Sequence, residues 1–353
     1  MNHLLPVNAL FICMISLATI YSATATRTTL FFRREIQWLG IASLAYIFFS
    51  LLDYKKYGKY YKAIYVFNLL LLIAVAVFGV SRKGAVRWIA LGPFTIQPSE
   101  FAKLFIVLTF SEFLVSKYRE RFDGFRSLLY SGLFILPVFL LILRQPDLGT
   151  ALVLIVIYLV LIFIHGIDWK MILLLIGSVI ATMPLVYFFL LKDYQRERIL
   201  TFINPEMNVS DSGWNVIQSM IAIGSGGVYG KGFMNNTQSK LRFLPESHTD
   251  FIGSVFLEER GLLGGMILLG LYLILIFQIL QIADTTEDPY GKLICYGISA
   301  IFFFHVTVNI GMIMGVMPVT GLPLLFMSYG GSSLLFSFMM LGIVQSVKVY
   351  RGE

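Results

Sequence analysis

The chain is poor in charge and in cysteine. Of its 353 residues only 13% are charged, whereas 58% are hydrophobic and the mean hydropathy is +0.80. A soluble domain of this size could not shield so much apolar side chain from water, so the composition predicts an integral membrane protein. The two cysteines, Cys13 and Cys295, fall within apolar segments, so neither a disulfide framework nor a zinc site is indicated.

Two catalytic motifs are also missing from the sequence. Ser-x-x-Lys, the nucleophile motif of penicillin-binding transpeptidases, occurs nowhere, and neither does the zinc motif His-Glu-x-x-His. We therefore expect that the chain does not cross-link peptides itself.

Long apolar runs are abundant, and about ten of them reach the roughly 20 residues that a membrane-spanning helix needs. A transmembrane barrel would alternate apolar and polar residues, whereas the run 152–164 is apolar without a break. We expect an all-α polytopic membrane protein, a single domain over 1–353, with a large extracytoplasmic loop at 192–258 between the seventh and eighth helices. The expected spans are 5–24, 36–52, 63–80, 98–115, 128–143, 151–166, 170–191, 259–282, 293–316 and 323–347.

The distribution of Lys and Arg favours cytoplasmic termini, because basic residues gather in cytoplasmic loops. The loops at 53–62 and 116–126 each carry four cations, and fewer fall in the loops between them. A cleaved signal sequence ending near Ala25 is the weaker alternative, since nothing basic precedes the first apolar run.

The formal net charge is +7. Cations on the outer face would suit an anionic, phosphate-bearing lipid.

The motif Gln97-Pro-Ser-Glu-Phe-Ala-Lys103 begins the fourth expected span. Glu100 and Lys103 are three residues apart and project from one face of the helix. Such a pair costs several kcal/mol to desolvate unless it faces a cavity or polar partners. It is either a buried pair that fixes helix packing or part of a substrate cavity.

The motif Arg144-Gln-Pro-Asp-Leu-Gly-Thr150 connects the fifth and sixth spans. Asp147 can cap the following helix by accepting from its free N–H groups. Alternatively, Asp147 and Arg144 add charge to an outward-facing site.

The long loop contains a glycine-rich stretch at 224–232 after an apolar segment, 214–223, that we expect to form a short interfacial helix. The glycines allow a nest of backbone N–H groups that binds an anion, with Lys231 adding a charge. The stretch differs from a nucleotide P-loop at Ser225 and Gly232.

Asp250 ends the polar run Asn236–Asp250, in which Lys240, Arg242 and His248 also lie. A carboxylate at the edge of a membrane bundle is a candidate functional residue by default. We interpret Asp250 as a general base that accepts a proton from a hydroxyl nucleophile. A helix cap, or an ion pair with Arg242 or Lys240, is the structural alternative. The segment 309–333 has two prolines and several glycines at membrane depth, which requires burial in protein or a cavity.

Five motifs together resemble the SEDS family (shape, elongation, division and sporulation) of bacterial peptidoglycan polymerases. They lie at 97–103, 145–150, 221–232, 237–252 and 317–332, and they occur in the family's order. Within the family, Gly321-Leu-Pro-Leu-Leu and the run Phe243–Asp250 resemble the elongation branch more than the division branch.

The resemblance implies a ten-span inverting glycosyltransferase with cytoplasmic termini, which polymerises lipid II on the outer face of the cytoplasmic membrane during elongation. Asp250 falls on the family's essential aspartate, which would activate the C4 hydroxyl of the acceptor sugar. Glu100 and Lys103 match its intramembrane pair. Further candidates for the substrate cavity are Arg144, Asp147, Lys231, Lys240, Arg242 and His248.

The resemblance also implies partners: a class B penicillin-binding protein and other membrane proteins of the elongation complex, but no nucleic acid. A divalent cation is the one candidate cofactor, and the residues do not specify it. A lipid II carrier or flippase is the alternative function. Transporters place their sites near the bilayer midplane, whereas Asp250 is expected at the membrane surface, which favours chemistry.

Overall fold

The computed structural model describes residues 4–25, 28–82, 85–91, 94–118, 124–185, 196, 212–245 and 247–350. Of the expected loop at 192–258, residues 192–195, 197–211 and 246 therefore lie outside the described residues. The prediction of an all-α polytopic membrane protein is confirmed.

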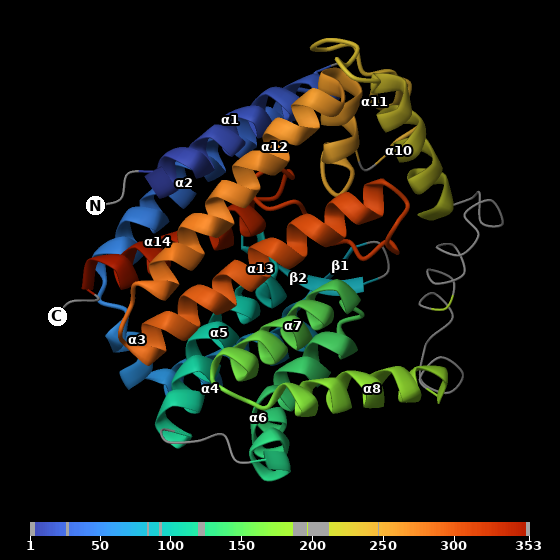
Figure 1. The fold of residues 1–353 in the computed structure, drawn as a ribbon. Coiled ribbons are helices and arrows are strands. Elements are labelled where there is room, and N and C mark those ends of the chain that lie inside the picture. Colours follow the sequence, from blue (N-terminus) through green and yellow to red (C-terminus); the bar gives the residue numbers. More distant parts are fainter. Residues whose placement is uncertain are drawn as a thin grey trace.

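Each of the ten expected spans overlaps a long helix (Figure 1). Six helices of the described part are long and apolar enough to cross a membrane: α1, α4, α6, α12, α13 and α14. The apolar helix α7 is shorter. The helices that match the expected spans are α1 (Leu4–Thr24), α2 (Leu30–Leu51), α4 (Tyr61–Phe78), α5 (Pro98–Lys117), α6 (Gly124–Arg144), α7 (Leu148–Ile164), α8 (Trp169–Leu185), α12 (Ile252–Asp284), α13 (Pro289–Ile313) and α14 (Gly331–Tyr350).

In the described part of the chain, three shorter helices lie between the spans: α3 (Lys55–Lys59), α10 (Ser212–Gly226) and α11 (Thr237–Lys240). The expected helix at 214–223 is thus confirmed as α10, which packs on α12.

A small antiparallel sheet between α4 and α5 was not expected from the sequence. It consists of β1 (Val80–Arg82), β2 (Ala85–Leu91) and β3 (Phe94–Ile96), in that order. Its residue pairs include Val80 with Trp88 and Ile89 with Ile96. β1 and β3 have only three residues each, and β2 does not alternate strictly between apolar and polar residues, so the sequence pattern did not indicate strands here.

The predicted start of the last span at 323 was wrong, since α14 begins at Gly331. Residues 314–330 form an irregular connection, the α13–α14 loop, in which Gly315 and Gly321 have positive φ angles of 72° and 71°. Helix α12 is also interrupted: Gly261 (φ 63°, ψ −166°) breaks its first turns from the long apolar part. A left-handed conformation of this kind is open to glycine without a steric penalty.

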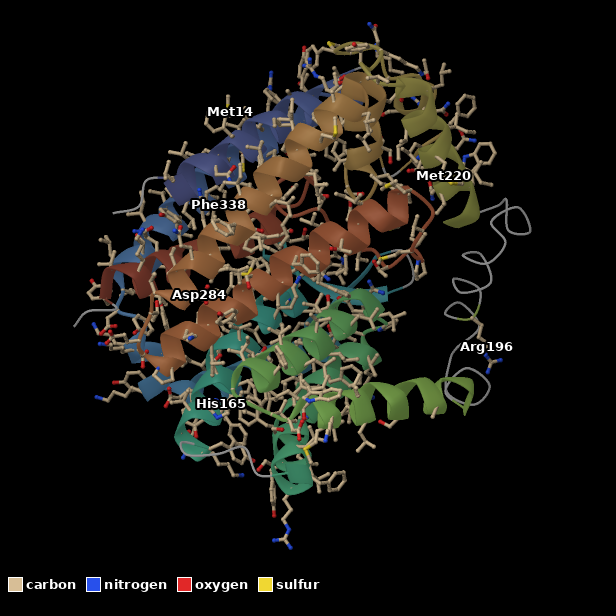
Figure 2. The ribbon with its side chains drawn as sticks, in the orientation of Figure 1. Met14, His165, Arg196, Met220, Asp284 and Phe338 are labelled. Carbon is tan, nitrogen blue, oxygen red and sulfur yellow. The ribbon has the colours of Figure 1, made fainter. Side chains whose placement is uncertain are left out.

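The bundle has two distinct ends. The hydroxyl of Tyr350 donates to Leu51 O, so α14 ends where α2 ends. Ser239 donates to Ala23 O, so the last turn of α1 lies beside α11 at the opposite end. We call these the terminal end and the Asp250 end. Figure 1 shows α3 and the last turn of α14 on one side of the molecule, and α10 and α11 on the other. In Figure 2, Asp284 and Met220 mark the same two ends.

Helix α13 connects the two ends through the middle of the bundle, where it packs against α5, α7 and α12 (Figure 1). Asp288, its N-cap, accepts from the Tyr54 hydroxyl at 2.8 Å at the terminal end. Near its other end, Asn309 contacts Asp250. At about 1.5 Å per helical residue these contacts are about 30 Å apart, which is the hydrocarbon thickness of a bilayer.

Candidate active site

Asp250 lies in a turn immediately before α12 and is half-buried. Its backbone is held by the side chain of Asn309, whose Nδ2 donates to Asp250 O at 2.9 Å. Its carboxylate faces the α13–α14 loop, because Oδ2 lies 3.9 Å from the position that a Cβ on Gly321 would take. The N-cap of α12 is Phe251, so Asp250 does not occupy the expected cap position. The carboxylate is therefore presented at the rim of the bundle next to Gly321, which is exposed in the described part of the chain.

His248 anchors the same turn. Its ring packs against Phe31 of α2, with ring centroids 4.6 Å apart, and against Tyr329 at 5.7 Å. Its carbonyl accepts from the backbone N–H of Tyr329 at 2.9 Å. The turn at 247–250 is thus fixed to the α13–α14 loop by Tyr329 and to α13 by Asn309.

The expected ion pair is present deeper in the bundle. Lys103 Nζ lies 2.9 Å from Glu100 Oε1 and 3.0 Å from Nε2 of His305. Lys103 also lies 4.7 Å from the centre of the Phe336 ring. Lys103 is completely buried and Glu100 is 4% exposed. The pair is therefore buried among protein groups, and its role in a substrate cavity stays a prediction.

Asp147 caps α7 as predicted, because its carboxylate accepts from Thr150 N at 3.3 Å. Its charged neighbour is Arg87 of β2, at 3.8 Å. Gln97 and Ser99 donate to its other oxygen at 3.0 and 2.8 Å. Arg144, the partner considered from the sequence, is exposed. The sheet thus places a cation beside Asp147. No pattern in the sequence indicated that residues 87 and 147 are neighbours.

Gly149 brings the start of α7 against the α13–α14 loop. A Cβ at this position would lie 2.8 Å from Thr320 O and 2.9 Å from Leu322 Cγ. Contacts below 3.0 Å require a shift, so only glycine permits this approach. The motif at 145–150 therefore supports the loop that faces Asp250.

Lys231 does not face an open anion site. Its Nζ lies 2.6 Å from Glu258 Oε1 and 3.0 Å from the hydroxyl of Thr237. The backbone N–H groups at 230, 231 and 232 donate to the carbonyls of Gly226, Glu258 and Glu259. These three donors are therefore engaged, and the predicted nest is not formed by them. The glycine-rich stretch instead ties α10 to the first turns of α12.

Lys240 donates to Met234 O within its own loop, and the side chain of Arg242 is exposed. No group of three or more His, Cys, Asp or Glu that could hold a metal occurs in the part of the chain that the structure describes.

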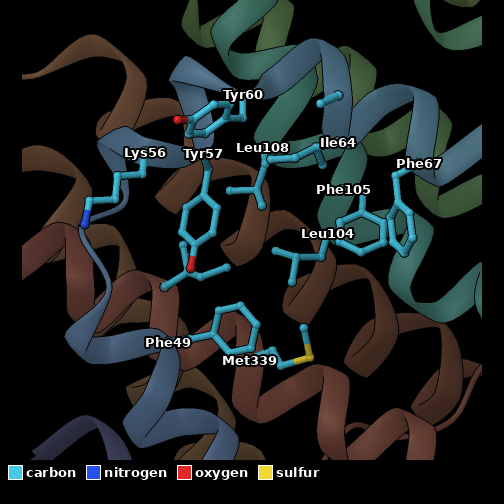
Figure 3. Close-up of a pocket in the computed structure, with 12 residues that line it drawn as sticks. Phe49, Lys56, Tyr57, Tyr60, Ile64, Phe67, Leu104, Phe105, Leu108 and Met339 are labelled. Atoms are coloured by element: carbon cyan, nitrogen blue, oxygen red, sulfur yellow. The ribbon is translucent and has the colours of Figure 1, made fainter.

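A groove of about 450 Å³ opens near the terminal end, away from Asp250 (Figure 3). Aromatic and aliphatic side chains line it, with Lys56, Tyr57 and Tyr60 at its α3 side. Its apolar lining comes from α2, α4, α5 and α14.

Sequence reasoning missed several residues that build the site. Asn309 was noted only as part of a broken segment, yet it is fully buried and joins Asp250 to Leu322. Glu259 was also missed; with Ser22 and Asn236 it forms a buried polar cluster at the Asp250 end. A usable signal existed, since a buried amide or carboxylate in an apolar span needs hydrogen-bonding partners.

These features define a class: a polytopic helical membrane protein with a carboxylate at one rim of the bundle and a buried ion pair beneath it. The family model described as "Cell cycle protein", which covers FtsW, RodA and SpoVE, matches residues 2–353. The chain belongs to this family, the SEDS family.

Named relatives agree with this assignment. The chain is 39% identical over 321 residues to the peptidoglycan glycosyltransferase MrdB of Escherichia coli K12, covering 90% of this chain and 85% of that protein. A solved structure described as "Structural coordination of polymerization and crosslinking by a peptidoglycan synthase complex" matches with a TM-score of 0.85 and 30% identity, over 98% of this chain and 97% of that one. The rod shape determining protein RodA of Thermus thermophilus matches with a TM-score of 0.74 and 29% identity, over 99% and 97%.

Proposed function

We propose that this protein is an inverting peptidoglycan glycosyltransferase that polymerises lipid II, with Asp250 as its general base. The observation that carries the proposal is the placement of Asp250. Its backbone is fixed by Asn309, its carboxylate faces an uncovered glycine, and it lies about 30 Å along α13 from the terminal end. The resemblance of the whole chain to enzymes named peptidoglycan glycosyltransferases supports the same reaction.

In the proposed step the C4 hydroxyl oxygen of the acceptor sugar attacks the anomeric carbon of the donor. A new glycosidic C–O bond forms as the bond from that carbon to the diphosphate breaks. The hydroxyl proton passes to Asp250, and undecaprenyl diphosphate leaves with the electron pair. Attack opposite to the leaving group inverts the anomeric carbon. Loss of a positioned general base typically slows a reaction by roughly 10²–10⁴-fold.

We propose that the terminal end is cytoplasmic and the Asp250 end is extracytoplasmic. Lys55, Lys56 and Lys59 of α3 lie at the terminal end, and positive residues gather on the cytoplasmic side of membrane proteins. Both chain termini and α3 would then face the cytoplasm, whereas the sheet, α10 and α11 would face outward. This orientation brings Asp250 to the side on which glycan strands are assembled.

We further propose that the protein acts in cell-wall elongation together with a class B penicillin-binding protein. The sequence lacks Ser-x-x-Lys, so a second protein must supply cross-linking. The matching synthase complex is described as coordinating polymerisation with cross-linking, which supports such a partner.

The test is Asp250→Asn in purified protein supplied with fluorescent lipid II and its penicillin-binding partner. The amide is nearly isosteric but cannot accept the proton, so we expect normal folding and glycan polymer formation reduced by roughly 10²-fold or more. Glu287→Gln, which makes the same carboxylate-to-amide change at an exposed position, is the control and should polymerise like wild type. Polymer made at the wild-type rate by folded Asp250→Asn protein would refute the catalytic role and favour the carrier alternative.

A further inference from the structure

Two side chains of α13 hold the same short piece of the α13–α14 loop. His305 Nδ1 lies 2.9 Å from Pro323 O, and Asn309 Nδ2 donates to Leu322 O at 2.9 Å. Residues four apart lie on one helix face, so the two side chains contact neighbouring carbonyls. Both are completely buried. Asn309 Nδ2 donates to Asp250 O as well, so one amide group joins the loop to the turn that carries Asp250.

The partners of His305 fix its protonation state. A carbonyl can only accept, so Nδ1 carries the proton that is donated to Pro323 O. An ammonium group can only donate, so Nε2 accepts from Lys103. His305 is therefore a neutral imidazole held between two partners. Glu100, His305 and Pro323 are thus joined through Lys103 in one continuous chain of buried hydrogen bonds.

The position of this loop determines what the carboxylate of Asp250 faces. Gly321, whose Cβ position would lie 3.9 Å from Asp250 Oδ2, is two residues from Pro323. Proline has no backbone N–H, so its carbonyl is the only backbone hydrogen-bonding group at position 323. Without the imidazole donor, Pro323 would lose its hydrogen bond to α13.

We infer that His305 is a positioning residue, which holds the α13–α14 loop in place through its bond to Pro323. On this view the Glu100–Lys103 pair orients His305 and does not touch the substrate. Asn309 fixes the Leu322 carbonyl and the backbone of Asp250 relative to each other. The inference rests on the proposed function, because it assumes that Asp250 is the base.

Two substitutions separate the two bonds of the imidazole. The amide nitrogen of Asn can occupy the place of Nδ1, so His305→Asn keeps a donor for Pro323 O but loses contact with Lys103. The amide oxygen of Gln can occupy the place of Nε2, so His305→Gln keeps an acceptor for Lys103 but leaves Pro323 O without its donor. Both variants retain one polar contact and are therefore comparable in burial cost.

We expect His305→Gln to lower kcat about 10- to 100-fold with KM for lipid II within about twofold, because misplaced catalytic geometry acts on turnover. His305→Asn should retain kcat within about threefold. Hydrogen exchange of the 314–330 peptide should rise in His305→Gln and stay near wild type in His305→Asn. His165→Gln, a histidine at the other end of the bundle that contacts Tyr118 O, is the matched control and should match wild type (Figure 2).

The reverse order of the two variants, or equal kcat and equal exchange in both, would overturn the inference. Exchange of the loop peptide distinguishes these outcomes even when both variants lose activity. Asp250→Asn, measured alongside, separates the two proposals. An active Asp250→Asn protein refutes the catalytic assignment. If Asp250→Asn is inactive but the two His305 variants do not differ in kcat and exchange as expected, only the positioning role is refuted.

Discussion

Removing the charge of Lys103 should strongly destabilise the protein, because it leaves the carboxylate of Glu100 buried without its cation. Lys103 is completely buried, Glu100 is 4% exposed, and Glu100 Oε2 already has no hydrogen-bonding partner. Breaking a buried ion pair by removing one member costs about 3–5 kcal/mol. A cost of this size lowers the folding equilibrium constant roughly 150- to 5,000-fold.

The assay is thermal unfolding of purified protein in detergent, together with lipid II polymerisation. Lys103→Met should melt well below wild type and polymerise more slowly, because the imidazole of His305 loses the partner that orients its Nδ1 toward Pro323 O. Lys117→Met makes the same chemical change at the exposed end of α5 and serves as the control. Lys117 lies 4.5 Å from the Tyr130 ring centre, so its loss should cost only about 0.5–1 kcal/mol.

The double variant Glu100→Leu/Lys103→Leu separates charge burial from loss of packing. It contains no unpaired charge, so we expect it to melt above Lys103→Met while its polymerisation stays low. Wild-type melting and activity in Lys103→Met would refute the reasoning. So would a double variant that is less stable than the single one.

Two further predictions follow from the loop contacts and from the two ends of the bundle. Gly149→Ala should lower polymerisation at least about tenfold, because its Cβ would push Thr320 away. Gly132→Ala is the control and should polymerise like wild type, since its Cβ would meet nothing closer than 3.7 Å. Equal activity of the two variants would show that the close approach at Gly149 is dispensable. The orientation can be tested with single cysteines in a background without Cys13 and Cys295. Asn235→Cys should react with an impermeant maleimide in intact cells or in spheroplasts, whereas Asp168→Cys should react only after the inner membrane is broken. The opposite pattern would reverse the proposed orientation.

The sequence alone determined the membrane class and the number of expected spans. Apolar runs of about 20 residues have one stable outcome in lipid, because a spanning segment must satisfy its backbone hydrogen bonds internally. The Glu100–Lys103 pair and the Asp147 cap were also predictable, since helical spacing and helix ends are local properties.

The tertiary structure decided which distant residues meet. Arg87 lies beside Asp147 because it belongs to a sheet that the hydropathy pattern did not indicate. Lys231 pairs with Glu258 and does not line an anion site. His305 and Asn309 are ordinary members of an apolar helix in the sequence. Only the path of the α13–α14 loop brings Pro323, Leu322 and Asp250 to them. Contacts of this kind depend on how helices pack across the bundle, and residue spacing along one segment does not record them.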